Sequence, residues 1–251
     1  MTTTQLPPED TTRSAAELDI HTRSDPHRRA SALSDVILGG QDGLVNVLGI
    51  ILGMAAATGD AHLVLVAGLA ATFAESVSMG AVAYTSTLAD ADFYESERER
   101  EYRHVQSVPG LEQEEIRSIY ARKGFTGELL ERIVDTITRD KDVWVAVMMA
   151  DEHRLTPVNR GSALRSGLIV GAAAIVGSLV PLLPFVVLPV QAGMWAALAA
   201  AAVVLFAVGA YKARVTVGHP GKSGLEMAFI GLASAFVGYL VGTLLRVPAA
   251  R

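Results

Sequence analysis

The chain has 251 residues, of which 51% are apolar, and it contains no cysteine. The lack of cysteine excludes disulfides, thiolate metal sites and cysteine nucleophiles, so any metal ligands must be carboxylates, imidazoles, thioethers or water. Acidic residues outnumber lysine and arginine by 26 to 21, and only 6% of the residues are aromatic. Nucleic acids are bound by basic surfaces and aromatic platforms, so we expect no nucleic-acid partner.

Five apolar stretches decide the fold class. Each is close to the ~20 residues that a helix needs to cross the hydrocarbon layer of a membrane. The sequence therefore predicts an all-α integral membrane protein with five transmembrane helices, and the lipid bilayer is its expected surrounding. The predicted spans are residues 34–57, 62–88, 163–183, 190–211 and 225–245.

The segments outside these spans have a different composition. Residues 1–33 are rich in Thr, Ser, Pro, Asp and Arg, which is typical of a disordered tail, and no signal peptide is evident. Residues 89–159 are rich in acidic residues, and breaks at Pro109-Gly110 and at 124–127 separate helical patterns. These patterns predict an inserted cytoplasmic domain of about three helices. The predicted domains are 1–33, 34–88, 89–159 and 160–251.

Basic residues predict the orientation in the membrane. Arginines precede the first span and basic residues separate the fourth span from the fifth, whereas the links at 58–61 and 184–189 contain no lysine or arginine. The positive-inside rule therefore predicts a cytoplasmic N-terminus and a cytoplasmic inserted domain. The compact loops and the lack of a presequence favour a bacterial inner membrane.

Ionisable residues inside the predicted spans are candidates for function, because a charge in hydrocarbon is costly unless it faces protein or water. Asp42 lies in the first span, with Asn46 one helical turn later on the same face. Glu75 lies in the second span one turn before Met79, and a carboxylate beside a thioether suits a borderline divalent ion. Asp42 and Glu75 as structural hydrogen-bonding groups, and Met79 as a packing residue, remain alternatives. Glu226 begins the fifth span and is interpreted as a solvated end residue.

The inserted domain carries a second set of potential metal ligands. They are Glu97, Glu101 and His104, spaced on one helical face; Glu112 and Glu115 after the Pro109 break; and Met148, Met149 and Glu152, with His153 alongside. Oxygen ligands favour hard divalent ions, whereas imidazole and thioether shift the preference toward iron-like or softer metals. The alternative is a solvated surface, because Glu and Arg alternate between residues 95 and 103 as in ordinary ion pairing.

Several short motifs occur in a specific order between residues 34 and 245. They are Gly39 to Leu44 with Asp42-Gly43; Ser78-Met79-Gly80 followed by Tyr84; Trp144 followed by Met148-Met149-x-x-Glu152; Pro181-Leu182-Leu183-Pro184; and Gly231, Gly238-Tyr239 and Gly242. In this order and spacing, the chain resembles the vacuolar iron transporter family.

The resemblance implies a homodimer with five spans per subunit and a metal path between the two first-span helices. It implies exchange of a cytosolic divalent metal, Fe²⁺ or Mn²⁺, for protons, with no permanently bound cofactor. Asp42 and Met79 would line the path. By the same resemblance, cytoplasmic residues would capture the ion first: Glu101, Glu112, Glu115, Met148, Met149 and Glu152.

Two positions depart from the family pattern. His104 stands where family members have a further glutamate, and a neutral imidazole still binds Fe²⁺. Ala71 stands where plant members have an acid two turns before the methionine of the second span, and Glu75 lies one turn before Met79 instead. A shift of one turn moves a carboxylate by about 5.4 Å with little rotation, so Glu75 could serve the same path at another depth.

Two other functions fit part of the pattern. A membrane-anchored ferritin-like protein would oxidise iron, and Glu101-Tyr102-Arg103-His104 has the Glu-x-x-His spacing of carboxylate di-iron centres. That motif normally occurs twice, and Glu152-His153 has the wrong spacing for a second copy. A metal-sensing membrane protein would bind metal without transporting it. The acidic residues Asp42 and Glu75 inside the membrane argue against this function. We therefore expect a transporter and not an enzyme.

Overall fold

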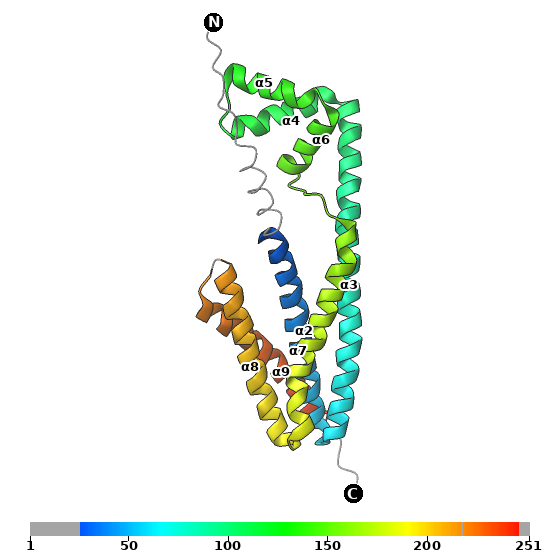
Figure 1. Ribbon diagram of the computed structural model, residues 1–251, viewed down its shortest axis with the longest axis vertical. Coiled ribbons are helices and arrows are strands. Elements are labelled where there is room, and N and C mark those ends of the chain that lie inside the picture. The colour runs from blue at the N-terminus through cyan, green and yellow to red at the C-terminus, as the bar shows by residue number, and fades with distance from the viewer. Residues whose placement is uncertain (1–25, 217, 246–251) are drawn as a thin grey trace, which may run out of the picture. The chain divides into compact units, whose positions relative to one another are not determined.

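The computed structural model describes residues 26–216 and 218–245, and within them every regular element is a helix (Figure 1). Among these described residues, five helices are long and apolar enough to cross a membrane. They are α2 (Pro26–Thr58), α3 (Ala61–Ser107), α7 (Ala163–Val187), α8 (Val190–Val215) and α9 (Pro220–Leu244). The predicted all-α membrane protein with five spans is confirmed.

The first helix begins earlier than the sequence predicts. The predicted disordered tail, residues 1–33, lies outside the described residues as far as residue 25, but residues 26–33 belong to α2. At its other end, α2 stops at a left-handed Gly59, with φ of 66°. The Asp60 carboxylate then accepts the backbone N–H groups of His62 and Leu63 at 2.8 and 3.3 Å. A glycine stop followed by an aspartate cap makes the tight helical hairpin between α2 and α3.

Two of the later spans have ends that differ from the predicted ones, and both differences involve prolines. Helix α7 continues through Pro181 and Pro184 to Val187, although the sequence predicts an end near residue 183. Each proline lacks one hydrogen-bond donor, but apolar membrane helices accept such gaps when neighbouring groups replace the bond. Helix α9 begins at Pro220, because proline suits the first helical turn. Glu226 therefore lies inside α9, where its side chain is 63% exposed and 3.9 Å from Lys222.

The described chain divides into two compact units. Unit 1 comprises the described residues up to 79 and from 169 onward, and unit 2 comprises residues 80–168. The sequence predicts boundaries near residues 88 and 160 instead, because the composition changes there. The chain between Ala61 and Ser107 contains no proline, so α3 runs through the boundary as one helix (Figure 1). The first helix of the predicted domain is therefore the second half of α3.

Unit 1 is held together by close contacts of α2 with α7 and α9. Its core includes Leu44, Leu48 and Ile51 of α2. A β-carbon on Gly177 of α7 would overlap the carbonyl oxygen of Gly40, and one on Gly242 of α9 would overlap that of Gly53. Small residues at such crossings let two backbones touch, which is how helices gain packing energy within a membrane.

Unit 2 adds short helices to the second half of α3. They are α4 (Pro109–Arg122), α5 (Gly127–Thr138), α6 (Lys141–Val147), the π-helix η1 (Met148–Glu152) and the 3₁₀ turn η2 (Arg160–Ser162). Pro109 lies in the first turn of α4, and Gly124 and Gly127 have positive φ between α4 and α5. Asp140 caps α6 by accepting the N–H groups of Asp142 and Val143. The core is apolar and includes Val105, Ile116, Val134, Trp144, Met148 and Met149.

Candidate functional site

Unit 2 contains a pocket of about 370 Å³ that is lined mostly by charged and imidazole side chains, and we call it the unit 2 pocket. Its walls come from the end of α3, the start of α4 and the end of η1. The lining residues are Glu97, Arg100, Glu101, His104, Val108, Leu111, Glu112, Glu115, Glu152 and His153. Three segments that are separate in sequence thus present carboxylates to one space.

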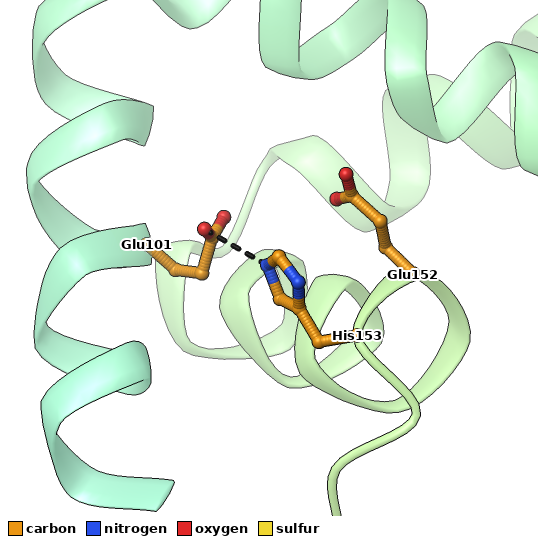
Figure 2. Close-up of side chains that lie close together, drawn as sticks. All are labelled: Glu101, Glu152 and His153. Atoms are coloured by element: carbon orange, nitrogen blue, oxygen red, sulfur yellow. Dashed lines mark hydrogen bonds and ion pairs between the residues drawn. The ribbon is translucent and has the colours of Figure 1, made fainter. Parts of the chain in front are cut away.

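Glu101 lines the pocket and is only 2% exposed. Its Oε1 atom lies 3.0 Å from Nε2 of His153, a contact drawn in Figure 2. The same oxygen lies 3.6 Å from Nδ1 of His104, and that nitrogen lies 3.5 Å from Oε1 of Glu112. Glu101 is therefore next to both imidazoles.

The side chains form two groups of potential ligands that share Glu101. One group is Glu101, Glu152 and His153, and the other is Glu101, His104 and Glu112; within each group the ligand atoms lie within 4.8 Å of one another. Ligands bound at 2.0–2.2 Å from one ion lie at most about 4.4 Å apart. Each group therefore needs only small side-chain rotations to hold a divalent ion.

Two buried carboxylate oxygens in the pocket lack a partner. Oε2 of Glu101 and Oε2 of Glu112 have no hydrogen-bond partner among the described residues, and their side chains are 3% and 4% exposed. A buried ionised oxygen without a partner is costly, and such groups in native proteins call for an explanation. The pocket cation Arg100 pairs with Glu97 at 3.1 Å. A cation bound between Glu101 and Glu112 would satisfy both oxygens.

The crowding of carboxylates alters their proton affinity. Burial, followed by repulsion from Glu101 and Glu115, raises the pKa of Glu112 to about 7, although the nearby His104 opposes this shift. Burial and repulsion from Glu115 also raise the pKa of Glu152. A bound cation favours the ionised carboxylate and reverses these effects. Metal and protons therefore compete for the pocket near neutral pH.

We expect metal affinity to fall by about tenfold when the pH is lowered from 8 to 6, because Glu112 with a pKa of about 7 changes from mostly ionised to mostly protonated over this range. The raised pKa also means that folding takes up a proton, so the metal-free protein should lose stability as the pH rises from 4.5 through 7. Titration calorimetry with Mn²⁺ in buffers of different ionisation enthalpy measures both the affinity and the proton released. Glu112→Gln should release fewer protons, and an affinity independent of pH would contradict this assignment.

Unit 1 contains a smaller polar group within its apolar helices. Nδ2 of Asn46 donates to Oε1 of Glu75 at 2.5 Å, which joins α2 to α3. Asp42 lies close enough to Glu75 for their carboxyl groups to interact. Met79 follows one turn after Glu75 and is partly buried, as are Asp42 and Glu75, whereas Asn46 is exposed. Asp42, Asn46 and Glu75 thus meet at the surface of unit 1.

The structure brings six of the predicted ligands of the inserted domain together but not the methionines. Glu97, Glu101, His104, Glu112, Glu115 and Glu152 line the unit 2 pocket. Met148 and Met149 are 0% and 1% exposed, belong to the hydrophobic core and do not line it. Packing against Trp144 and its neighbours explains their burial.

The sequence indicates His153 only as a neighbour of the potential ligand Glu152, and the spacing of Glu152-His153 excludes only a second Glu-x-x-His motif. The structure places His153 in the pocket wall, 3.0 Å from Glu101. The backbone at residues 148–152 is a π-helix, which has more residues per turn than an α-helix. A sequence pattern with α-helical periodicity does not reveal such a turn, and the adjacency to Glu152 was the only signal.

Residues 33–243 match the VIT family over most of the chain. The chain belongs to the VIT family. Vacuolar iron transporter 1 of Oryza sativa subsp. japonica is 34% identical over 80% of this chain and 81% of its own length. Vacuolar iron transporter 1 of Arabidopsis thaliana is 32% identical over 87% of this chain and 88% of its own length.

The vacuolar iron transporter of Toxoplasma gondii is 30% identical over 96% of this chain. The unit 2 pocket and the polar group of unit 1 both lie within the residues that match the VIT family. Five apolar helices and this membership identify a multi-pass membrane protein.

Proposed function

We propose that this VIT-family protein transports a divalent metal, Fe²⁺ or Mn²⁺, out of the cytosol in exchange for protons. The observation that carries the proposal is the polar group of Asp42, Asn46 and Glu75 within membrane-spanning helices of a chain whose relatives are named iron transporters. Carboxylates at such positions are costly and mark ion pathways. Met79, one turn from Glu75, adds a thioether to the path.

The coupling follows from the chemistry of a carboxylate. Metal binding to a carboxylate displaces its proton, so the two cations compete for one site. Asp42 and Glu75 alternate between holding metal and holding protons, and each cation leaves on the side from which the other arrives. An ion drives exchange only if it binds the inward and outward states differently. The proton gradient then sets the direction of metal flux.

The unit 2 pocket supplies the ion in this scheme. Its ligands Glu97, Glu101, His104, Glu112, Glu115 and Glu152 collect Fe²⁺ or Mn²⁺ from the cytosol before transfer to Asp42. The ion is cargo, so it is bound with fast exchange and the protein needs no permanent cofactor. Unit 2 and the N-terminus are cytoplasmic, and the membrane is a bacterial inner membrane.

A second copy of the chain completes the path. Asn46 is exposed on the surface of unit 1, and its neighbours Asp42 and Glu75 are only partly buried. Polar groups inside a membrane face protein or water because contact with lipid tails leaves them unsatisfied. A homodimer that apposes the two α2 helices would remove these groups from lipid and form a path between them.

Iron oxidation is an alternative to transport, and the arrangement of ligands around Glu101 favours it. Glu101 is shared between two groups that each contain an imidazole and a further carboxylate, as in carboxylate di-iron enzymes. Such an enzyme would consume oxygen when Fe²⁺ is added. We expect no oxygen consumption above the uncatalysed rate, which an oxygen electrode measures directly.

Metal-driven proton movement in proteoliposomes tests the proposal. With an interior pH dye and Fe²⁺ or Mn²⁺ added outside, metal entry should raise the interior pH as protons leave. Asp42→Ala should reduce this movement by at least about tenfold, because an intramembrane ligand and proton carrier is lost. Glu226→Ala is the matched control, since it removes an exposed acid from another apolar helix, α9. Metal binding without coupled proton movement would disprove exchange.

A further inference from the structure

His153 contacts a buried carboxylate and lines the unit 2 pocket. Its Nε2 atom lies 3.0 Å from Oε1 of Glu101, and its side chain lines the unit 2 pocket beside Glu152 (Figure 2). The side chain is 29% exposed, so an ion in the pocket can reach it. His153 is the second imidazole of the pocket after His104.

The backbone is built irregularly around this residue. The N–H of His153 donates to the carbonyl of Met148 at 3.2 Å, and the N–H of Leu155 donates to that of Met149 at 2.8 Å. Arg154 between them has φ of 57°, a left-handed conformation that glycine usually adopts at a helix end. The π-turn and the left-handed residue together hold His153 against the pocket. Irregular turns of this kind cluster at functional sites.

A purely structural role for His153 would be to neutralise Glu101. The structure argues against this role, because Oε2 of Glu101 remains buried and without a partner although His153 contacts Oε1. Acids also dominate the rest of the pocket: its other charged or titratable residues are Glu97, Arg100, His104, Glu112, Glu115 and Glu152. An ion placed among Glu101, Glu152 and His153 would use the imidazole and balance the carboxylates.

We propose that His153 is a metal ligand of the unit 2 pocket and that it strengthens the preference of the pocket for Fe²⁺ over Mn²⁺. Imidazole suits Fe²⁺ and later metals, whereas sites with only carboxylate, carbonyl and water suit Mn²⁺ and Mg²⁺, and Fe²⁺ also binds a given site more tightly than Mn²⁺. This inference rests on the proposed function, because it treats the pocket as the place where cargo is collected. With one imidazole in each ligand group, the pocket selects the metal before transport.

Replacing His153 by glutamine separates ligation from positioning. Glutamine keeps an N–H donor for Glu101 but is a poor ligand for Fe²⁺. The full-length protein in detergent is titrated without oxygen, with the electron paramagnetic resonance signal of free Mn²⁺ as the readout and Fe²⁺ as the competitor. His153→Gln should lower the ratio of Fe²⁺ to Mn²⁺ affinity by at least about fivefold. His62→Gln, an exposed histidine at the start of α3 and outside the pocket, should leave the ratio unchanged.

The outcomes separate this inference from the proposed function. An equal loss of affinity for both metals, or no loss, would overturn the assignment of His153 as a selective ligand and leave transport untouched. A wild-type protein that binds neither metal would overturn both. A spectroscopic measurement covers the case in which His153→Gln does not fold. In His104→Gln loaded with Mn²⁺, pulsed resonance should still detect a coordinated imidazole nitrogen, and its absence would contradict ligation by His153.

Discussion

Replacing Gly242 by leucine should prevent unit 1 from folding. A β-carbon at residue 242 would overlap the carbonyl oxygen and the carbonyl carbon of Gly53, so the clash is with backbone and not with a flexible side chain. Helices α2 and α9 would have to separate along their contact, and the close packing that stabilises membrane helices would be lost. Overpacking of side chains alone costs about 1–3 kcal/mol, and a backbone clash should exceed this.

The measurements are the yield and monodispersity of detergent-purified protein on size-exclusion chromatography, and its melting temperature. Gly221→Leu is the matched control, because Gly221 lies in the first turn of the same helix and no other segment of the described chain lies within 4 Å of a β-carbon built there. Gly242→Leu should aggregate or fail to accumulate, whereas Gly221→Leu should behave as wild type. A monodisperse Gly242→Leu protein with an unchanged melting temperature would show that α2 and α9 are not in backbone contact.

Replacing Glu101 by glutamine should remove metal binding and stabilise the metal-free protein. Glu101 belongs to both ligand groups of the unit 2 pocket, so both lose a carboxylate at once. Loss of a residue that only hydrogen-bonds to a metal ligand commonly lowers metal affinity by about 10–100-fold. Loss of a ligand shared by two groups should therefore lower it by at least about 100-fold. The amide keeps the shape of the side chain but removes a buried charge whose Oε2 has no partner in the described part of the chain.

Calorimetry with Mn²⁺ and thermal melting without metal test the two halves of this prediction. Glu99→Gln is the control, because Glu99 is an exposed acid on the same helix and lies outside the pocket. When a residue serves function at the expense of stability, its substitution raises the stability of the protein and lowers its activity. If Glu101→Gln instead melts at a lower temperature and binds metal normally, Glu101 is a structural residue and the pocket is not a metal site.

Local patterns in the sequence predicted most of the membrane part. Helix α8 begins at Val190, the residue that the apolar pattern indicates, because length and hydropathy alone decide whether a helix can cross a bilayer. The patterns did not reveal that two segments of different composition share one helix. Nothing between Leu88 and Ala89 breaks a helix, so the change from apolar to acidic residues does not end α3.

The candidate site was predicted in part. Glu101, His104, Glu112 and Glu115 lie on helical faces that the spacing defines, and these faces do line one pocket. Met148 and Met149 were predicted beside them, but a thioether also packs well in an apolar core, and only the folded unit shows that both lie there. The polar contact of Asn46 with Glu75 joins two helices, so no spacing along one helix reveals it.

Local sequence patterns are enough to establish the class of this protein: five apolar helices, an acidic segment between the second and third, and the ordered motifs of the VIT family. These properties are local, because hydropathy and helical periodicity depend on neighbouring residues. Which side chains converge depends on how distant segments pack against one another. Glu101 meets Glu112 and His153 only because α3, α4 and a π-turn fold onto one core, and helix contacts such as Gly53 with Gly242 depend on backbones far apart in the chain.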